Sequence, residues 1–205
     1  MAKIKFTKGE LKRQRDALKQ YERYLPTLQL KKQQLQIEIL NQLSILEEKE
    51  LQEEKIREAI EVWSGLLTDS DIDLREWVRP KEVITGLKNI AGVGLPLFDH
   101  VEFELAEYDL FVTPLWVDAA IDALRELVSV RQEIAVVKKG IEILRHELRI
   151  TTQRVNLFEK VKIPEAKEII RLIKIYLGDQ MANAVGRSKI AKRKIEEAVL
   201  AEVTA

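Results

Sequence analysis

Apolar residues recur at helical spacing along two long stretches of the chain. In the first, from Thr7 to about Gly65, most steps are three, four or seven residues, which predicts the seam of a coiled coil. Thr7, followed three residues later by Glu10, predicts the N-terminal cap of this helix. The apolar positions are Leu11, Leu18, Leu25, Leu28, Leu35, Ile39, Leu43 and Leu46, then Ile56, Ile60, Trp63 and Leu67.

The second stretch follows Pro114, a residue suited to the first turn of a helix, and extends to about Ala198. Its stripe alternates strictly between steps of four and three residues, which again predicts a coiled-coil seam. The stripe consists of Val137, Ile141, Leu144, Leu148, Thr151, Val155 and Phe158, and we expect it to resume beyond Pro164 at Ile169, Leu172 and Tyr176.

The segment between the two stretches, residues 66–113, has a different pattern. Val101, Phe103 and Leu105 alternate with two glutamates, which is the period of a β-strand. Together with the turn signal Gly92–Pro96, this predicts a β-hairpin. The earlier part, "LLTDSDIDLREW", predicts a loop followed by a short helix.

These elements predict a mainly α protein: a long antiparallel two-helix coiled coil with a small head that contains the hairpin. Each stripe is too narrow to be buried alone, so residues 1–65 and 114–205 are expected to pair, with residues 66–113 as the head. Pairing places Trp63 and Trp116 level with each other, and with Trp77 they could form an aromatic base of the head. Three unrelated buried tryptophans are the alternative.

Two prolines interrupt the helical pattern. The stripe passes Pro26 without a change of phase, so a kink within a continuous helix is favoured over a stop. Antiparallel pairing brings Pro164 to a neighbouring level. We therefore expect bending or local unwinding near residues 22–26 and 160–164.

Composition limits the possible classes of protein. Charged residues make up 33% and apolar residues 46% of the chain, which does not fit a disordered protein. The absence of cysteine excludes disulfides and cysteine-based zinc sites. The N-terminus lacks the apolar core of a signal peptide, and no apolar run approaches membrane-spanning length. A cytoplasmic protein without direct membrane insertion is expected.

Candidate chemistry is sparse. There is no phosphate-binding loop of the G-x-x-x-x-G-K-[ST] type and no serine nucleophile motif. His100 and His146 have no partner at metal-ligand spacing. We therefore expect no catalytic, cofactor-binding or metal-binding residue.

Charge is distributed unevenly, with basic ends and an acidic middle. Residues 1–32 carry ten Lys or Arg against three acids. Antiparallel pairing would place both basic ends at the same tip, where they could bind nucleic acid, enter an acidic socket of a partner protein, or simply be solvated. The isoelectric point of 6.8 and the lack of an aromatic stacking platform near either cluster argue against nucleic acid. The candidate interface residues are Lys8, Lys12, Arg13, Arg15, Arg187, Lys189, Lys192 and Arg193.

Two stretches, "YLPTLQLKKQQLQIEI" (24–39) and "RITTQRVNLFEKVKIPEAKEIIRLIKIYL" (149–177), resemble the D subunit of V-type and A-type ATPases, the central rotor axle. The resemblance covers both long helices. Its matching positions are Leu28, Lys31 and Lys32 in the first stretch, and Arg154, Val155, Asn156, Glu159 and Pro164 in the second. Gln153 before the arginine and Leu157-Phe158 after the asparagine depart from the common family pattern.

The resemblance implies a non-catalytic shaft that couples ATP synthesis or hydrolysis in a catalytic hexamer to ion transport, for example of protons, by a membrane ring. The implied partners are the catalytic and regulatory subunits of the hexamer, a small side-binding stalk subunit and a funnel subunit above the ring. The chain would thus be cytoplasmic and peripheral to the membrane. Alternatives are a coiled-coil hairpin like the flagellar export stalk, acting as a scaffold or ATPase activator, and a nucleic-acid-binding coiled coil.

Overall fold

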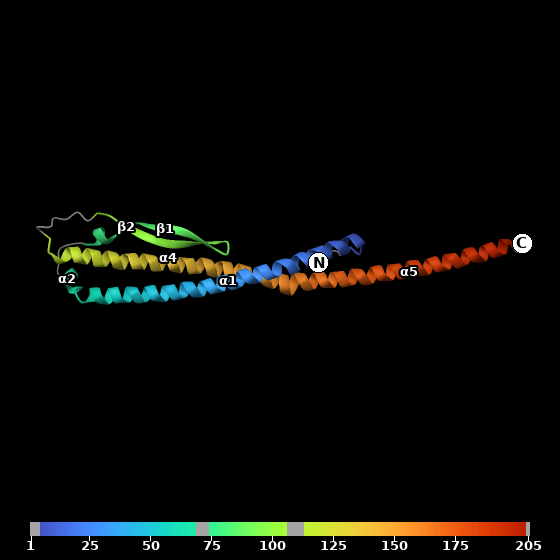
Figure 1. Ribbon diagram of the computed structural model, residues 1–205, viewed down its shortest axis with the longest axis horizontal. Coiled ribbons are helices and arrows are strands. Elements are labelled where there is room, and N and C mark those ends of the chain that lie inside the picture. The colour runs from blue at the N-terminus through green and yellow to red at the C-terminus, as the bar shows by residue number, and fades with distance from the viewer. Residues whose placement is uncertain (1–4, 69–73, 106–112, 204–205) are drawn as a thin grey trace. The chain divides into compact units, whose positions relative to one another are not determined.

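A computed structural model describes residues 5–68, 74–105 and 113–203 (Figure 1). The predicted class is confirmed, because long helices dominate and a single hairpin supplies the described strands. The elements are α1 (Lys8–Glu61), α2 (Gly65–Thr68), α3 (Arg75–Val78), β1 (Pro80–Ile90), β2 (Val93–Phe103), α4 (Trp116–Leu157), the π-helix η1 (Phe158–Lys162) and α5 (Ile163–Val203).

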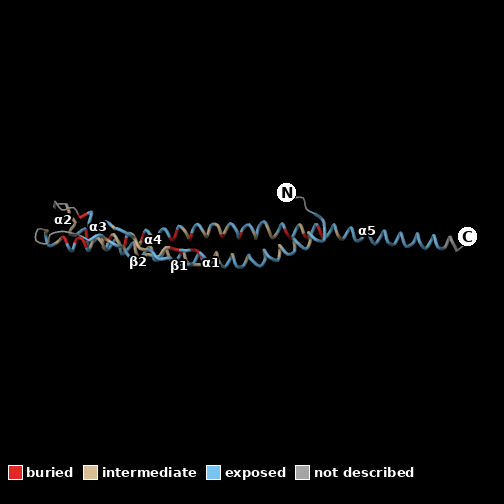
Figure 2. The backbone as a smooth tube through the Cα atoms, turned by 90° about the horizontal axis from the view of Figure 1, so that it is seen from above, coloured by how far each residue is buried: buried red, intermediate tan, exposed pale blue. Residues whose placement is uncertain are grey.

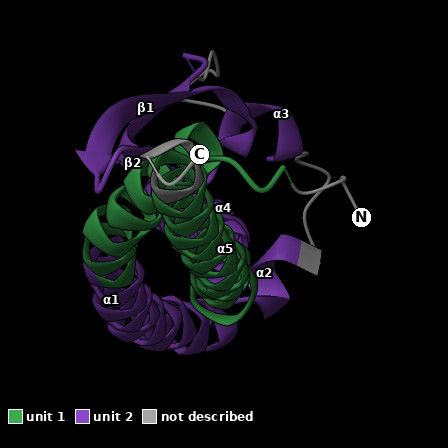
Figure 3. Ribbon diagram, turned by 90° about the vertical axis from the view of Figure 1, so that its right-hand side faces the viewer, with its two compact units in different colours: residues 1–29, 153–205 green, residues 30–152 purple. Residues whose placement is uncertain are grey.

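The chain divides into two compact units (Figure 3). Unit 1 contains residues 1–29 and 153–205, and unit 2 contains residues 30–152. In unit 1 the helices run antiparallel, because Phe6 contacts Tyr176 and Tyr21 contacts Phe158, with ring centroids 5.0 and 5.4 Å apart. Each unit therefore contains its own part of the helix pair.

Helix α1 begins and continues as the sequence predicts. The Glu10 backbone N–H donates a hydrogen bond to Thr7 Oγ1 at 3.2 Å, so Thr7 satisfies one of the unpaired N–H groups of the first turn. The helix passes through Pro26 without a break. The predicted stripe follows the buried and half-buried positions of the helix (Figure 2). The expected change of axis direction at residues 22–26 stays a prediction.

The expected unwinding near residues 160–164 is confirmed as a π-helical turn. The Ile163 N–H donates to the Phe158 carbonyl, five residues back, instead of the four of an α-helix. Pro164 directly follows; it has no N–H, and in a regular helix its ring would clash with the carbonyl of Lys160. The wider turn relieves this conflict by accommodating one additional residue.

The π-helical turn also corrects the predicted seam. Heptad spacing from Val155 predicts Leu172 and Tyr176 as core positions, but these side chains are 36% and 42% exposed. The predicted Ile169 is only half-buried. The buried residues lie one position later, at Ala166, Ile170 and Ile173. One additional residue in the turn rotates everything beyond it by about 100°, which single-sequence heptad spacing does not reveal.

In unit 2 the hairpin is confirmed, but its turn lies earlier than predicted, and of the range Gly92–Pro96 only Gly92 belongs to it. The reversal occurs at Ala91–Gly92, where both residues have positive φ angles of 52° and 77°. Such angles suit the turn that joins two twisted strands, and Gly92 adopts them without steric cost. The Asn89 side chain accepts a hydrogen bond from the Gly92 N–H at 3.0 Å. Pro96 instead lies within β2, opposite Leu87.

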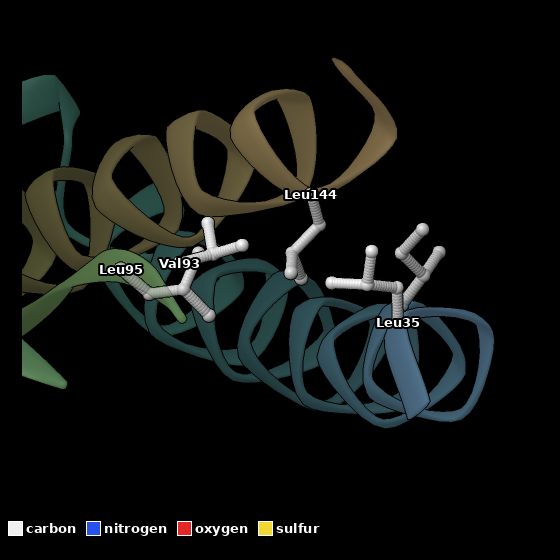
Figure 4. Close-up of a cluster of buried hydrophobic side chains, with 5 residues drawn as sticks. Leu35, Val93, Leu95 and Leu144 are labelled. Atoms are coloured by element: carbon white, nitrogen blue, oxygen red, sulfur yellow. The ribbon is translucent and has the colours of Figure 1, made fainter. Parts of the chain in front are cut away.

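The tip of the hairpin is part of the core of unit 2. Val93 and Leu95 of β2 pack against Leu144 of α4 and Leu35 of α1 (Figure 4). The side chains of Leu144 and Leu35 are fully buried. Ile39 completes this group of buried residues, called here the hairpin cluster. Two paired helices bury only a narrow stripe, so the hairpin supplies a third surface that widens the core.

A second core, the tryptophan cluster, lies at the other end of unit 2. Its buried residues are Leu74, Val117, Ala120 and Ile121. Trp63, Trp77 and Trp116 pack against it, which confirms the predicted aromatic base of the head.

Arg125 of α4 holds the base of the hairpin. Its guanidinium donates to the carbonyls of Trp77 at 3.0 Å and Glu104 at 2.7 Å, and it lies 5.3 Å from the Phe103 ring centroid. One side chain thereby joins α4 to α3 and to the end of β2.

Candidate functional site

The positions that match the family motifs in the sequence fall into two structural groups. Leu28 and Val155 belong to the seam, where Val155 is buried. Arg154, Asn156 and Glu159 are exposed, and Lys31, Lys32 and Pro164 are half-buried or exposed at the edge of the seam. We infer that the apolar motif positions serve helix pairing, whereas the exposed polar ones are available to contact other molecules.

The N-terminal basic cluster lines a hollow on the surface of unit 1. This hollow has a volume of about 650 Å³ and lies between the first turns of α1 and the middle of α5. Lys8, Lys12 and Arg15 from α1 and Lys174 from α5 line it, against the single carboxylate of Asp16. Leu11, Leu177 and Met181 form its apolar part. Such a surface suits a partner that presents carboxylates around an apolar side chain.

Arg13, the remaining predicted residue of this cluster, is directed differently. It helps to line a neighbouring hollow with Gly9 and Gln20, and its guanidinium lies 3.9 Å from Glu10. It is highly exposed, so this ion pair contributes little stability.

The C-terminal basic cluster is not level with the N-terminal one, contrary to the sequence prediction. Phe6, near the start of α1, contacts Tyr176, whereas the second cluster begins eleven residues later at Arg187, about 16 Å further along α5. Helix α5 continues well beyond the residues that contact the start of α1. Both basic clusters therefore belong to unit 1 but lie at different positions along α5. All side chains from 178 to 199 are exposed.

The sequence interpretation also missed the acidic partners of this cluster. Lys192 lies 3.7 Å from Glu196, and Arg193 lies 3.4 Å from Glu197. The i,i+4 spacing was the available signal. These exposed ion pairs partly neutralise the end of the cluster, which leaves Arg187 and Lys189 as its more strongly basic part.

The described residues contain no group of three or more His, Cys, Asp or Glu side chains arranged to hold a metal ion. A further hollow of about 470 Å³ lies between the hairpin turn and α4, lined by Glu142, His146 and Glu147 among others. In the described part of the chain, no helix is long and apolar enough to cross a bilayer.

One exposed carboxyl has a shifted pKa. The side-chain hydrogen bond from Arg171 lowers the pKa of Glu168, and the same bond raises the pKa of Arg171. The guanidinium donates to both carboxylate oxygens, at 2.9 and 2.6 Å. This geometry is a helix-surface ion pair and not an acid–base site.

Comparison with known proteins identifies the family. The family model for the D subunit of ATP synthase matches residues 10–193. The chain belongs to this family. A V-type ATP synthase D subunit from Borreliella burgdorferi is 48% identical over 195 residues, covering 95% of this chain and 96% of the relative. One from Chlamydia pneumoniae is 35% identical over 198 residues, covering 94% and 93%.

The family assignment confirms the resemblance carried by residues 24–39 and 149–177. The match to the family model also includes the head, residues 66–113, in which the sequence motifs alone found no resemblance. A relative from Chlamydia trachomatis, 32% identical over 206 residues, covers 96% of this chain and 98% of its own length. The chain is therefore a subunit of the V/A-type ATP synthase class, which disfavours the flagellar-stalk and nucleic-acid alternatives.

Proposed function

We propose that this chain is the central rotor shaft of a V/A-type ATP synthase. It transmits rotation between a hexamer that makes or hydrolyses ATP and a membrane ring that moves ions, and it performs no covalent chemistry itself. Membership of the D-subunit family of ATP synthases over nearly the full length is the observation that carries the proposal.

Physical features of the two units support a mechanical role. A shaft needs helices that resist separation, and each unit joins the two long helices mainly through its buried apolar seam. Exposed ion pairs also cross between the helices and contribute little stability. Lys167 lies 3.3 Å from Glu22 in unit 1, and Lys138 lies 2.8 Å from Glu50 in unit 2.

The proposed contact with the hexamer is the basic surface of unit 1. A helix whose side chains are all exposed is only marginally stable in water, so the run from 178 to 199 favours a role inside a surrounding partner. Its mixture of charges and scattered apolar residues suits a bearing that slides without one fixed contact. The hollow formed by Lys8, Lys12, Arg15 and Lys174 is proposed to face acidic side chains of the hexamer.

The other partners follow from the same proposal. A small stalk subunit would bind along the side of the helices, and a funnel subunit would contact the shaft on the membrane side. The chain would be cytoplasmic and held at the membrane only through the complex.

The decisive experiment is reconstitution with the catalytic and regulatory subunits of the same organism. Co-purification and ATPase turnover are measured with and without this chain. The proposal predicts a stable complex whose turnover changes when the chain is added. A hexamer that neither binds the chain nor responds to it would refute the shaft function.

Charge reversal tests the proposed contact surface. The variant K12E/R15E/K189E/K192E is compared with K55E/K88E/K139E/R145E, which reverses four exposed charges in unit 2. The first variant is expected to lose hexamer binding or turnover stimulation, and the second to retain both. Equal losses would show that net charge, and not this surface, governs assembly. Circular dichroism checks that both variants are folded.

A further inference from the structure

Two charged residues occupy core positions of the α1 seam in unit 2. Lys49 and Glu53 follow Leu46 and precede Ile56 at steps of three and four residues, and all four are half-buried. The side chains of Lys49 and Glu53 are only 27% and 25% exposed. Core positions of a coiled coil normally carry apolar side chains, so this stretch departs from the rest of the seam.

Each of these residues forms an ion pair with α4. Lys49 Nζ lies 2.8 Å from Glu133 Oε2, and Arg131 Nε donates to Glu53 Oε1 at 2.7 Å. The four residues Lys49, Glu53, Arg131 and Glu133 are called here the charged layer. Opposite charges face each other across the helix pair, so α1 contributes ion pairs here in place of apolar side chains.

The charged layer lies between the two apolar cores of unit 2. The hairpin cluster uses Leu35 and Ile39 of α1, before the layer, and the tryptophan cluster includes Trp63, after it. On α4 the order is reversed, with the tryptophan cluster before residue 131 and Leu144 after residue 133, as antiparallel helices require. Between the two apolar cores, α4 still buries Val130 and Ile134, whereas α1 presents the charged side chains of Lys49 and Glu53 to it.

We propose that the charged layer is a salt-sensitive joint, at which the helices of unit 2 open locally while both apolar cores stay packed. Ion pairs that are partly exposed contribute little stability and are screened by salt, whereas salt does not weaken apolar burial. Water can also enter a charged layer at a lower cost than an apolar one, because both charges are solvated when they separate. In the proposed shaft, torque would twist the helix pair preferentially at this layer; this last consequence rests on the proposed function.

Hydrogen exchange of the full-length chain tests the joint directly. Amide exchange is measured at low salt and in about 1 M NaCl, where the screening length falls to about 3 Å. Relative to amides of residues 35–43, those of residues 49–53 and 131–134 are expected to exchange roughly threefold to tenfold faster at high salt. Equal salt responses in the layer and the hairpin cluster would overturn the proposal.

A matched pair of variants locates the effect. K49L/E53L/R131Q/E133Q makes the α1 seam continuous, and it should abolish the salt response and slow exchange in the layer. The control E50Q/K138Q removes a cross-helix ion pair of the same 2.8 Å length whose side chains are 47% and 55% exposed.

The control is expected to keep the salt response of the wild type. If the control loses it as completely as the first variant, the exposed pair carries the effect and the joint proposal is wrong. The wild-type comparison decides the question even if the fourfold variant does not fold. All of these measurements use the chain alone, so their failure is distinguishable from failure of the shaft function.

Discussion

Because of the π-helical turn at residues 158–162, we expect that one residue can be deleted there with little loss in the free energy of unfolding. The turn holds one residue more than an α-helical turn, and the seam beyond it is buried one position late. Removing Val161, which is half exposed, should convert the turn to regular α-helix and leave Ala166, Ile170 and Ile173 on the seam. Regular helix would place Pro164 in a helix interior, so every variant in the comparison carries Pro164→Ala.

The matched control deletes Glu168 in the same background. This deletion removes an exposed ion pair, but it also rotates Ile170 and Ile173 off the seam. In the native chain these two side chains lie on the seam and are only 8% and 0% exposed. Full burial of an isoleucine stabilises by about 1.5–3 kcal/mol, so the control should lose about 3–6 kcal/mol. Deletion of Val161 should change the free energy of unfolding by less than about 1 kcal/mol.

Urea denaturation followed by far-UV circular dichroism measures both losses against Pro164→Ala alone. Hydrogen exchange of residues 166–177 shows whether any loss is confined to unit 1. If deletion of Val161 costs as much as deletion of Glu168, the turn does not set the phase of the seam, and the reasoning fails.

Three further predictions concern single positions. Leu144→Ala in the hairpin cluster should lower the free energy of unfolding by about 2–5 kcal/mol, because the side chain is fully buried, whereas Leu40→Ala, at 64% exposure, should change it little in the same urea titration. Gly92→Ala should destabilise the hairpin by about 1 kcal/mol, because the turn requires a φ of +77°, and thermal unfolding with unchanged stability would contradict this. NMR titration should give Glu168 a pKa below that of a free glutamate, and Arg171→Gln should remove this shift. Because the pKa is lowered, the ion pair stabilises the helix at pH values above the ordinary glutamate pKa, and this stabilisation is lost as the pH falls through the lowered pKa.

Most of the secondary structure could be predicted from the sequence because it depends on local patterns. The stripe from Leu11 to Ile60 predicts one face of α1, and its half-buried and buried positions match that face, whereas Trp63 and Leu67 lie beyond the end of this helix at Glu61. The alternation at Val101 and Phe103 predicts a strand, and the cap at Thr7 rests on three residues of local geometry. Each of these signals requires no knowledge of what packs against the segment.

The candidate site was less predictable because it depends on how far one helix extends beside another. The charges of both basic clusters can be counted in the sequence, but their separation along α5 depends on where α1 begins to contact it. Likewise, the sequence alone predicts that Lys49 and Glu53 are ordinary surface charges. Only the folded chain shows that Glu133 and Arg131 of α4 lie beside them. Spacing along one chain does not reveal such cross-helix partners.

Local patterns were enough to establish two long, amphipathic helices with a hairpin between them, and two short motifs indicated the family. Periodicity and capping act within a few residues, so they can be recognised in a single sequence. Three features emerged only from the folded chain: the phase of the seam after Phe158, the burial of Val93 and Leu95 between the helices, and the charged layer that separates two cores. Each of these depends on contacts between distant segments, where packing overrides the local repeat.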